Sequence, residues 1–473
     1  MLAENMDSIL TLSGTRQAEL VRRREISSRE LVETHLKQIS NVNPAINAAI
    51  DVFGERALKE ADAADAMLAR DGAAGPLHGV PFSIKDSIEV AGTPCTAGTL
   101  GRRTVPPSAE DAALVAALRR AGAIPIAKTN LPDLLFAFET DNLIFGRTNN
   151  PYGFDRTSGG SSGGEAALIA ACGSPFGLGS DAAGSVRVPA AFCGIASIKP
   201  TSGRLPRTGH FPPASGWLEM IWQIGPMARR VEDLVTLMPL LAAADGRDHT
   251  VVEMPVGRLS DVKLRDLRVA FYTDNGIRAA DGEVTRVVRK AAQALSGEVR
   301  SVDEKKPACL AAAYDLEMRL IGADGGDGLR QYHRDLGSSE AHPLLTGWLD
   351  KLEAYRCDLA GFQNCWEQWR QFKTEMLLFL QDYDAILCPV YTHAALRHGE
   401  SIVDDNFQGF SHTMTYNVAG WPAAVVRCGA SAEGLPLGVQ IAAAPWREDV
   451  ALAIALRLEG EFGGWVEVGC IGQ

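Results

Sequence analysis

The stretch between Gly159 and Pro200 is the strongest constraint that this sequence places on its own fold. It is unusually rich in glycine, alanine and serine, and it begins with the run SGGSSGGE at residues 158–165. Side chains this small allow a backbone to approach another element or a ligand closely. The residues that follow the run, EAALIAACG, are too apolar to be solvated. We therefore expect a buried segment here, where packed elements or a ligand meet the backbone.

Four other interpretations of SGGSSGGE are weaker. A flexible linker does not suit so short a run with an apolar continuation. A phosphate-binding loop needs a lysine after its glycines, and a dinucleotide fingerprint needs an apolar strand before them. No lysine follows here, and the preceding NNPYGFDRTS is turn-like. Residues 159–163 match G-x-S-x-G, but that serine motif must follow a buried strand, for which YGFDRTS is a poor candidate.

The composition indicates a globular enzyme and disfavours several other classes of protein. Of 473 residues, 46% are hydrophobic and 22% are charged. The net charge of −12 argues against a nucleic-acid partner and against an anionic membrane surface. Nine cysteines without a C-x-x-C pair argue against a zinc site and suit a reducing compartment. With no signal-peptide pattern and no run of 18 apolar residues, we expect a cytoplasmic protein without a membrane anchor.

Helical and strand-like patterns alternate along the chain, which is typical of an α/β fold. Residues 15–70 look helical, with Ser27 and Glu30 as a capping box. Ser108 is expected to cap the helix that precedes the strand-like residues 124–129. Residues 309–380 look mostly helical, and we expect their aromatic stripe to be core packing rather than a substrate site. The stripe consists of Phe362, Trp366, Trp369, Phe372 and Met376.

Several motifs, in a fixed order along nearly the whole chain, resemble those of the amidase signature family of serine hydrolases. The fatty acid amide hydrolase and nylon-oligomer hydrolase branches are the most similar in texture. The motifs are PLHGVPFSIKD, AGAIPIAKTN, GRTNNPY, GGSSGGEAALIA, GSDAAGSVRVPAAFCGIASIKPT, ILCPV, NVAGWPAA and GLPLGVQIAA.

The resemblance implies one large α/β domain, with a twisted mixed sheet covered by helices on both faces. Within residues 1–473 we expect four parts. They are N-terminal helices (1–70), a catalytic core (71–245), a helical region that covers the substrate (300–380), and C-terminal strands with a helix (381–473).

By this resemblance the catalytic residues are Lys85, Ser161 and Ser185. Ser185 matches the nucleophile, Ser161 the proton relay and Lys85 the general base. A lysine acts as a base only when neutral, so burial must lower its pKa from about 10.4. Neighbouring side chains on a strand point to opposite faces, so we expect Lys85 to face the site and Asp86 to face away.

The resemblance also assigns supporting positions around these three residues. A cis peptide bond is expected between Gly160 and Ser161, and Ser162 is expected to hydrogen-bond within the turn. Asp181 and Arg187 are expected to form an ion pair that orders the loop. Phe136 and Phe138 fall where the family lines its acyl-binding region. The oxyanion hole is expected from backbone N–H groups of Ala182, Ala183, Gly184 and Ser185, although Ala183 stands where the family usually has glycine.

The function implied is hydrolysis of a C–N bond in a hydrophobic or aryl amide, through an acyl-enzyme and without a metal or other cofactor. A carbamate (urethane) or ester is the alternative substrate, because all three pass through a tetrahedral oxyanion. An amidotransferase A-type subunit is less favoured, since Val188 stands where that branch usually has glutamine. We expect a small-molecule substrate, no nucleic-acid partner, and a monomer or homodimer.

Overall fold

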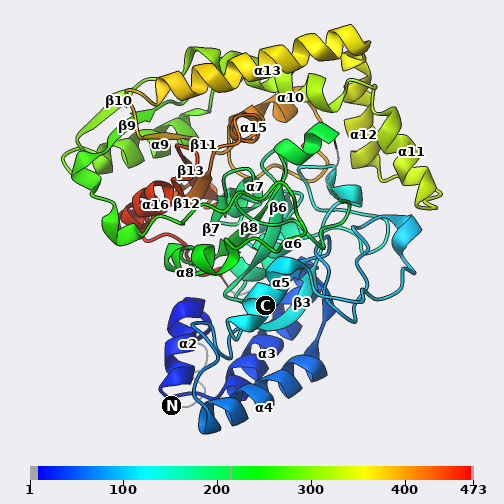
Figure 1. The fold of residues 1–473 in the computed structure, drawn as a ribbon, viewed down its shortest axis with the longest axis vertical. Coiled ribbons are helices and arrows are strands. Elements are labelled where there is room, and N and C mark those ends of the chain that lie inside the picture. Colours follow the sequence, from blue (N-terminus) through cyan, green and yellow to red (C-terminus); the bar gives the residue numbers. More distant parts are fainter. Residues whose placement is uncertain (1–8, 214–215, 470–473) are drawn as a thin grey trace.

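A mixed β-sheet runs through the centre of the molecule (Figure 1). The computed structural model describes residues 9–213 and 216–469. Within these ranges the sheet has 11 strands in the order β1-β3-β2-β6-β8-β7-β12-β13-β11-β9-β10, and β4 and β5 form a separate pair. The strands are β1 (Ala49–Val52), β2 (Pro81–Lys85), β3 (Ile124–Thr129), β4 (Asn149–Asn150), β5 (Gly153–Thr157), β6 (Phe176–Asp181), β7 (Ala196–Lys199), β8 (Gln223–Ala228), β9 (Arg268–Phe271), β10 (Ser301–Glu304), β11 (Ala385–Pro389), β12 (Ala423–Ala430) and β13 (Pro436–Ala443).

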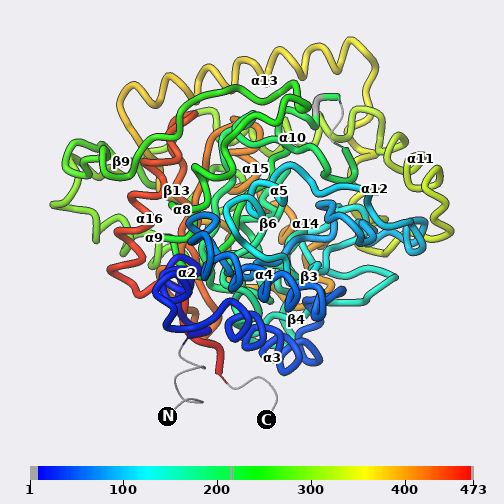
Figure 2. The backbone as a smooth tube through the Cα atoms, turned by 60° about the horizontal axis from the view of Figure 1, so that its bottom comes forward, coloured from blue at the N-terminus to red at the C-terminus, as the bar shows by residue number. Residues whose placement is uncertain are grey.

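Helices flank this sheet, as the sequence predicts. The N-terminal helices α2–α4 lie at one end of the molecule and the long helix α13 crosses the opposite end (Figures 1 and 2). The helices are α2 (Gly14–Arg22), α3 (Ser28–Ile46), α4 (Gly54–Arg70), α5 (Ala113–Arg120), α6 (Gly163–Ala170), α7 (Arg187–Phe192), α8 (Val231–Leu241), α9 (Gly282–Leu295), α10 (Ala313–Ile321), α11 (Asp327–Asp335), α12 (Pro343–Leu352), α13 (Leu359–Phe379), α14 (Asp404–Gly409), α15 (Ser411–Val418) and α16 (Glu448–Phe462).

Alternate residues of β12 show that both faces of the sheet carry a core. Ala424 and Val426 are buried in a hydrophobic cluster with residues of α8, α9 and α16. Val425, between them, is buried in a second cluster with residues of α6 and α7. Successive side chains of a strand point to opposite faces. The predicted fold class, a single α/β domain built on a mixed sheet with helices on both faces, is therefore confirmed.

The pairing of β2 with β6 brings two distant parts of the sequence to one edge. These neighbouring strands are parallel, with Ser83 opposite Gly177 and Ile84 opposite Leu178. Their carboxyl ends therefore lie together, at Lys85 on β2 and at Ser180 and Asp181 on β6. This edge is where the candidate site forms.

Two local predictions fail and one holds. The capping box is present, because Ser27 accepts from the Glu30 backbone while the Glu30 side chain accepts from Ser27. Strand β1 interrupts the helices expected throughout 15–70. Ser108 is not a cap: α5 begins at Ala113 after Ala112, without a side-chain cap. The Ser108 N–H instead donates to the carbonyl of Thr93 in a turn.

The aromatic stripe of α13 is mostly core, as predicted. Trp369, Phe372 and Met376 are buried in one cluster, and Phe362 packs partly against it. Trp366, in contrast, is 39% exposed. Among the residues that the structure describes, no helix combines the length and the apolar character needed to cross a bilayer.

Candidate active site

Lys85 lies at the end of β2 with its amine enclosed by serine oxygens. Its Nζ is 2.7 Å from Ser161 Oγ, 3.0 Å from Ser162 Oγ and 3.1 Å from Ser180 Oγ. The side chain is fully buried. Burial lowers the pKa of Lys85 well below its ordinary value, although the charges of Asp181 and Glu165 oppose the shift. The neutral amine that a general base requires is thus favoured here.

Asp86 faces away from this amine, as the alternation of side chains along a strand predicts. Its carboxylate lies 3.0 Å from the ammonium of Lys128, and both groups are buried. It also accepts hydrogen bonds from the backbone N–H and the hydroxyl of Thr96. Because Asp86 is occupied on the other side of the strand, it does not hold Lys85 in the charged form.

The glycines of SGGSSGGE allow this turn to press against its neighbours. The peptide bond between Gly160 and Ser161 is cis, as the resemblance implied. A Cβ on Gly160 would lie 2.5 Å from the backbone nitrogen of Glu139, and one on Gly164 would lie 2.5 Å from that of Asn130. Real Cβ atoms do not approach so closely, so both positions exclude larger residues. The buried, close-packed segment expected from the composition is found.

Ser162 makes more contacts than the turn alone requires. Besides its approach to Lys85, its hydroxyl accepts from the Ser180 backbone N–H at 3.3 Å. Its own N–H donates to the carbonyl of Ser185 at 3.1 Å. Ser162 therefore joins the glycine-rich turn to β6 and to the loop that follows β6.

Ser185 lies in that loop, in the order that the motif predicts. Gly184 has a φ of +128°, and a Cβ on it would meet the hydroxyl of Thr413 at 2.2 Å, so glycine is required there. Ala183 is not among the residues with positive φ. The alanine that departs from the family pattern thus falls at a position whose conformation it can adopt.

Three of the four N–H groups predicted for the oxyanion hole have no acceptor in the described chain. They belong to Ala182, Ala183 and Ser185. The fourth, of Gly184, donates to the Asp181 carboxylate at 2.8 Å. Free backbone donors beside a serine hydroxyl are suited to a developing oxyanion. Ser185 itself is 8% exposed, and no hydrogen bond joins its hydroxyl to Ser161 within the described ranges.

A buried ion pair holds the loop from behind, as predicted for Asp181 and Arg187. Arg187 Nε lies 3.0 Å from Asp181 Oδ2, and its Nη2 lies 2.9 Å from Oδ1. Burial alone would raise the pKa of Asp181, but the Arg187 charge and its hydrogen bonds outweigh that and hold it below its usual range. The carboxylate also accepts from the N–H of Val186 at 3.1 Å.

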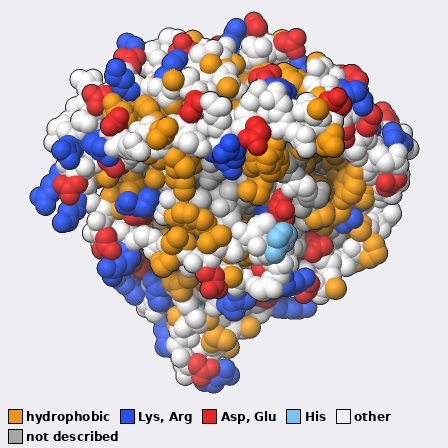
Figure 3. Space-filling view, turned by 45° about the horizontal axis from the view of Figure 1, so that its top comes forward, with side chains coloured by type: hydrophobic (Ala, Val, Ile, Leu, Met, Phe, Trp, Pro, Cys, Tyr) orange, Lys and Arg blue, Asp and Glu red, His pale blue; other side chains and the backbone are white. Residues whose placement is uncertain are grey.

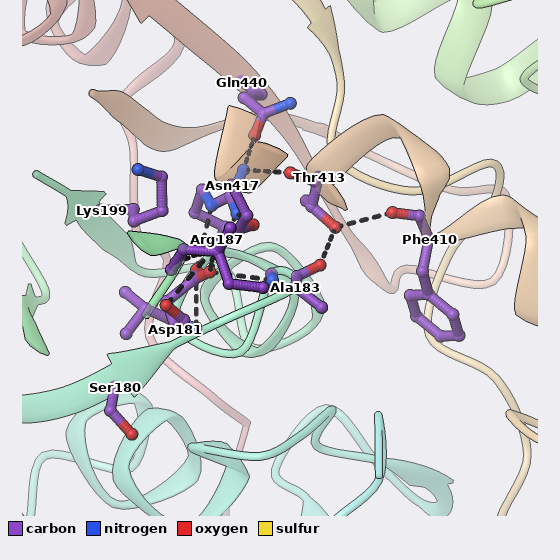
Figure 4. Close-up of polar contacts among 12 residues, drawn as sticks. Ser180, Asp181, Ala183, Arg187, Lys199, Phe410, Thr413, Asn417 and Gln440 are labelled. Atoms are coloured by element: carbon purple, nitrogen blue, oxygen red, sulfur yellow. Dashed lines mark hydrogen bonds and ion pairs between the residues drawn. The ribbon is translucent and has the colours of Figure 1, made fainter. Parts of the chain in front are cut away.

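Helix α15 and β13 complete this network from the C-terminal part of the chain (Figure 4). Arg187 Nη1 donates to the carbonyl of Thr413 at 2.8 Å and to Gln440 Oε1 at 2.6 Å. Asn417 donates to Asp181 Oδ1 at 2.9 Å. The Thr413 hydroxyl lies 2.8 Å from the Ala183 carbonyl, which fixes the peptide plane that precedes Gly184. The loop is thus positioned by residues more than 200 positions away.

A cavity with an empty volume of about 490 Å³ opens above these groups. Ser161 and Ser185 lie on its wall together with Ala182 and Ala183, and Phe136 and Phe138 also line it. Phe138 stacks on Phe410 with ring centres 3.8 Å apart. Residues 300–380 contribute Ile321 and Trp348 to the wall. No described lining residue carries a charge.

Sequence reasoning missed several residues of this site. Ser180 directly precedes Asp181, so its place at the end of a strand was a usable signal. Trp222, Ile321 and Trp348 carry no local signal, because only the tertiary fold brings them to the cavity. The same is true of Thr413, which reaches the loop at Ala183 through the fold. No group of three or more His, Cys, Asp or Glu side chains in the described ranges is placed to hold a metal ion.

Comparisons with known proteins agree on one class. A family model described as Amidase matches residues 30–452. Human fatty-acid amide hydrolase 2 is 32% identical, covering 97% of this chain and 91% of its own length. The A-type subunit of the glutamyl-tRNA(Gln) amidotransferase from Methylacidiphilum infernorum is also 32% identical, covering 97% and 96%. The structure of 6-aminohexanoate cyclic dimer hydrolase superposes with a TM-score of 0.84 at 28% identity, over 96% of this chain and 97% of that one.

The fold and these relatives define a hydrolase of carbon–nitrogen bonds. Within that class, the chain belongs to the amidase signature family.

Proposed function

We propose that this protein hydrolyses uncharged hydrophobic or aryl amides by a Ser-Ser-Lys mechanism through an acyl-enzyme. The observation that carries the proposal is the 2.7 Å approach of the buried Lys85 amine to the Ser161 hydroxyl, on the wall of the cavity that Ser185 also lines. A nucleophile, a relay and a base in this order are the parts that acyl transfer needs.

In the proposed reaction Ser185 Oγ attacks the amide carbon while its proton passes to Ser161, and the Ser161 proton passes to Lys85. The oxyanion accepts hydrogen bonds from the free N–H groups of Ala182, Ala183 and Ser185. Collapse breaks the C–N bond, and the proton returns through Ser161 to the leaving amine. Water then attacks the acyl-enzyme with the same relay as base, which releases the acid and regenerates Ser185.

The lining of the cavity favours an uncharged substrate over glutamine, the amide that an amidotransferase would use. Glutamine carries an ammonium and a carboxylate that need charged or polar partners. The described lining residues offer aromatic and aliphatic side chains and three serines, and none with a charge. Carbamates and esters pass through the same oxyanion and stay as alternative substrates within this proposal.

The test is a hydrolysis screen of the purified protein on matched amides, carbamates, esters and glutamine. We expect aryl or apolar amides to be turned over and glutamine to be inert. In parallel, a fluorophosphonate probe is expected to modify Ser185, as mapped by peptide mass spectrometry, and Ser185→Ala is expected to abolish labelling. Modification of Ser161 instead, or full activity of Ser185→Ala, overturns the mechanism.

A further inference from the structure

A second, larger chamber lies directly outside the catalytic cavity. Its empty volume is about 1560 Å³, part of it open to solvent, which is about three times that of the inner cavity. Four residues line both spaces, namely Phe136, Leu218, Trp222 and Ile321. We call the larger space the outer chamber; its own walls include Leu320, Leu329, Tyr332, Cys357, Leu359 and Phe362.

We infer that the outer chamber binds the larger substituent of the substrate, an apolar group without negative charge, while the scissile bond lies in the inner cavity. The inference rests on the proposed function. The four shared residues stand between the two adjacent spaces, so a substituent too large for the inner cavity would reach the outer chamber past them. Residues common to both walls are therefore the ones that set how wide a substituent can pass.

The apolar character of the chamber comes from the region around α10–α13. Leu320 and Leu329 flank a glycine-rich turn between α10 and α11, and Phe362 lies in the first turn of α13. Figure 3, with the α13 side turned forward, shows hydrophobic side chains gathered among charged ones on this face. An aryl or alkyl group that binds against such a wall removes apolar surface from water, which favours binding.

The charges on the chamber wall have one sign. Asp324 and Asp358 are the charged residues among its described lining, and no lysine or arginine joins them. Both are fixed by backbone hydrogen bonds: Asp324 accepts from Gly326 at 2.7 Å, and Asp358 accepts from Gly361 at 2.8 Å. Two fixed carboxylates repel an anionic substituent and tolerate a neutral or cationic one.

Cys357 provides a way to fill the chamber selectively. It lies on the chamber wall and is exposed, whereas the other described cysteines are buried or, at Cys309, half-buried. A thiol reagent can therefore place a group of chosen size in the outer chamber without touching Ser185. We propose to compare methyl methanethiosulfonate, which adds a small group, with N-phenylmaleimide, which adds a bulky one.

The first experiment measures kcat/KM before and after each label, on one small acyl amide and on amides with a large aryl group at either end. We expect the bulky adduct to reduce kcat/KM at least tenfold for a large substrate and less than twofold for the small one. The Cys357→Ser enzyme, compared with its own untreated form, should be insensitive to the same reagent. Equal effects on small and large substrates, or no effect on either, overturn the inference.

The second experiment tests the sign of the charge. Amides that differ only in a distal methyl, ammonium or carboxylate group are compared as substrates. We expect the carboxylate compound to have the lowest kcat/KM. The double variant Asp324→Asn with Asp358→Asn should raise its kcat/KM about three- to fivefold relative to that of the methyl compound. Asparagine keeps one acceptor oxygen for the Gly326 and the Gly361 N–H groups, but at position 324 the second hydrogen bond, from the Gly328 N–H, is lost. Urea unfolding of the double variant therefore checks that the fold is retained. An anionic substrate that equals the neutral one in the unmodified enzyme contradicts the inference.

Failure of this inference is separable from failure of the proposed function. If fluorophosphonate still labels Ser185 and the small amide is still hydrolysed, the catalytic proposal stands whatever the chamber does. If Ser185 is unreactive, the catalytic proposal fails first. A variant with Leu359→Trp, at an exposed residue that lines the outer chamber and not the inner cavity, adds bulk there and gives an independent measurement. We expect a raised KM for large amides alone, and an unchanged KM for them contradicts the inference.

Discussion

The two sides of the catalytic cavity are built in different ways. On the side that holds the catalytic groups, Lys85, Ser162 and Asp181 each make several hydrogen bonds and are buried. On the helical side, Trp348 lines the cavity and its indole N–H is buried without a hydrogen-bond partner in the described chain. Both carboxyl oxygens of Glu317, in α10 of the same helical region, are also buried without such a partner there. Hydrogen bonds thus fix the first side, and apolar packing shapes the second. The groups that we propose for catalysis are thus held by hydrogen bonds, while the helical wall of the cavity is shaped by packing.

The largest effect that this comparison predicts is the loss of Lys85. Lys85→Met should lower kcat about 10³- to 10⁴-fold, because residues that act as one catalytic unit fail together. Ser185→Ala should lower kcat by about the same factor. The double variant Lys85→Met with Ser185→Ala should lower kcat by little more than either single change. Steady-state kinetics on the best amide from the screen gives the measurement. If kcat of the double variant fell by the product of the two single-variant factors, the residues would act independently, which would contradict a single catalytic unit.

Removal of the arginine behind the loop should be the largest effect on stability. Arg187→Met leaves the Asp181 carboxylate buried without its partner. Breaking a buried pair in this way costs about 3–5 kcal/mol. Urea unfolding followed by tryptophan fluorescence gives the value. As a control, Arg370→Met removes an ion pair whose arginine is 73% exposed and whose glutamate is 66% exposed, and it should cost less than about 1 kcal/mol.

The sequence predicted those parts of the fold and of the candidate site that a local residue pattern marks. The proposed catalytic groups lie in motifs where close packing requires small residues at Gly160, Gly164 and Gly184, so a local pattern marks them. Strand β1 was missed because its four residues, AIDV, lie between two long helical patterns. Ser108 has a capping sequence, but a turn uses its backbone instead.

The helical side of the cavity could not be predicted in the same way. Ile321 and Trp348 reach the cavity through the packing of α10 and α12, and any apolar residue of suitable size satisfies a local helical pattern there. Such positions carry no motif because no hydrogen bond or backbone conformation restricts them. The same freedom explains why the resemblance assigned the catalytic residues by number but gave residues 300–380 only a general role.

Two buried ionisable groups, one on each side, predict opposite pH dependence of stability. Glu317→Met should stabilise the protein by about 1–3 kcal/mol at neutral pH, since it removes a buried group without partners. Burial raises the pKa of Glu317 well above its usual range, so the native state binds the extra proton. The wild type therefore loses stability as pH rises above the unfolded pKa of about 4.3. The stabilisation by Glu317→Met grows correspondingly with pH.

Lys85 predicts the opposite pH dependence of stability. Its folded pKa is lowered, so the unfolded state binds the extra proton and the wild type gains stability as pH rises toward the unfolded pKa of about 10.4. The stability of Lys85→Met relative to the wild type should therefore fall with rising pH. Urea midpoints from pH 6 to 9 for both variants test the pair. Parallel trends would contradict the protonation states inferred here.

A smaller effect on catalysis is expected at Thr413, which positions the loop from α15. Thr413→Val removes the hydroxyl that lies 2.8 Å from the Ala183 carbonyl. We expect kcat to fall about tenfold with little change in KM, because the loop donors act mainly on the developing oxyanion. Thr413→Ser should restore the rate. Thr415→Val is the matched control, since that buried hydroxyl donates to Ser411 within the same helix.

The smallest predicted effect concerns Trp348, whose ring packs edge-on against Phe136 and Phe407. Trp348→Phe loses some packing area but also removes an N–H without a partner, so the two effects offset and stability should change by less than about 1 kcal/mol. Trp369→Phe is the matched control: that indole donates to the Val418 carbonyl at 2.7 Å, and its loss should cost about 1–3 kcal/mol. If Trp348→Phe and Trp369→Phe lower the free energy of unfolding equally, the unpartnered N–H of Trp348 has no measurable effect on stability. The two sides of the cavity would then differ only in having polar or apolar surface.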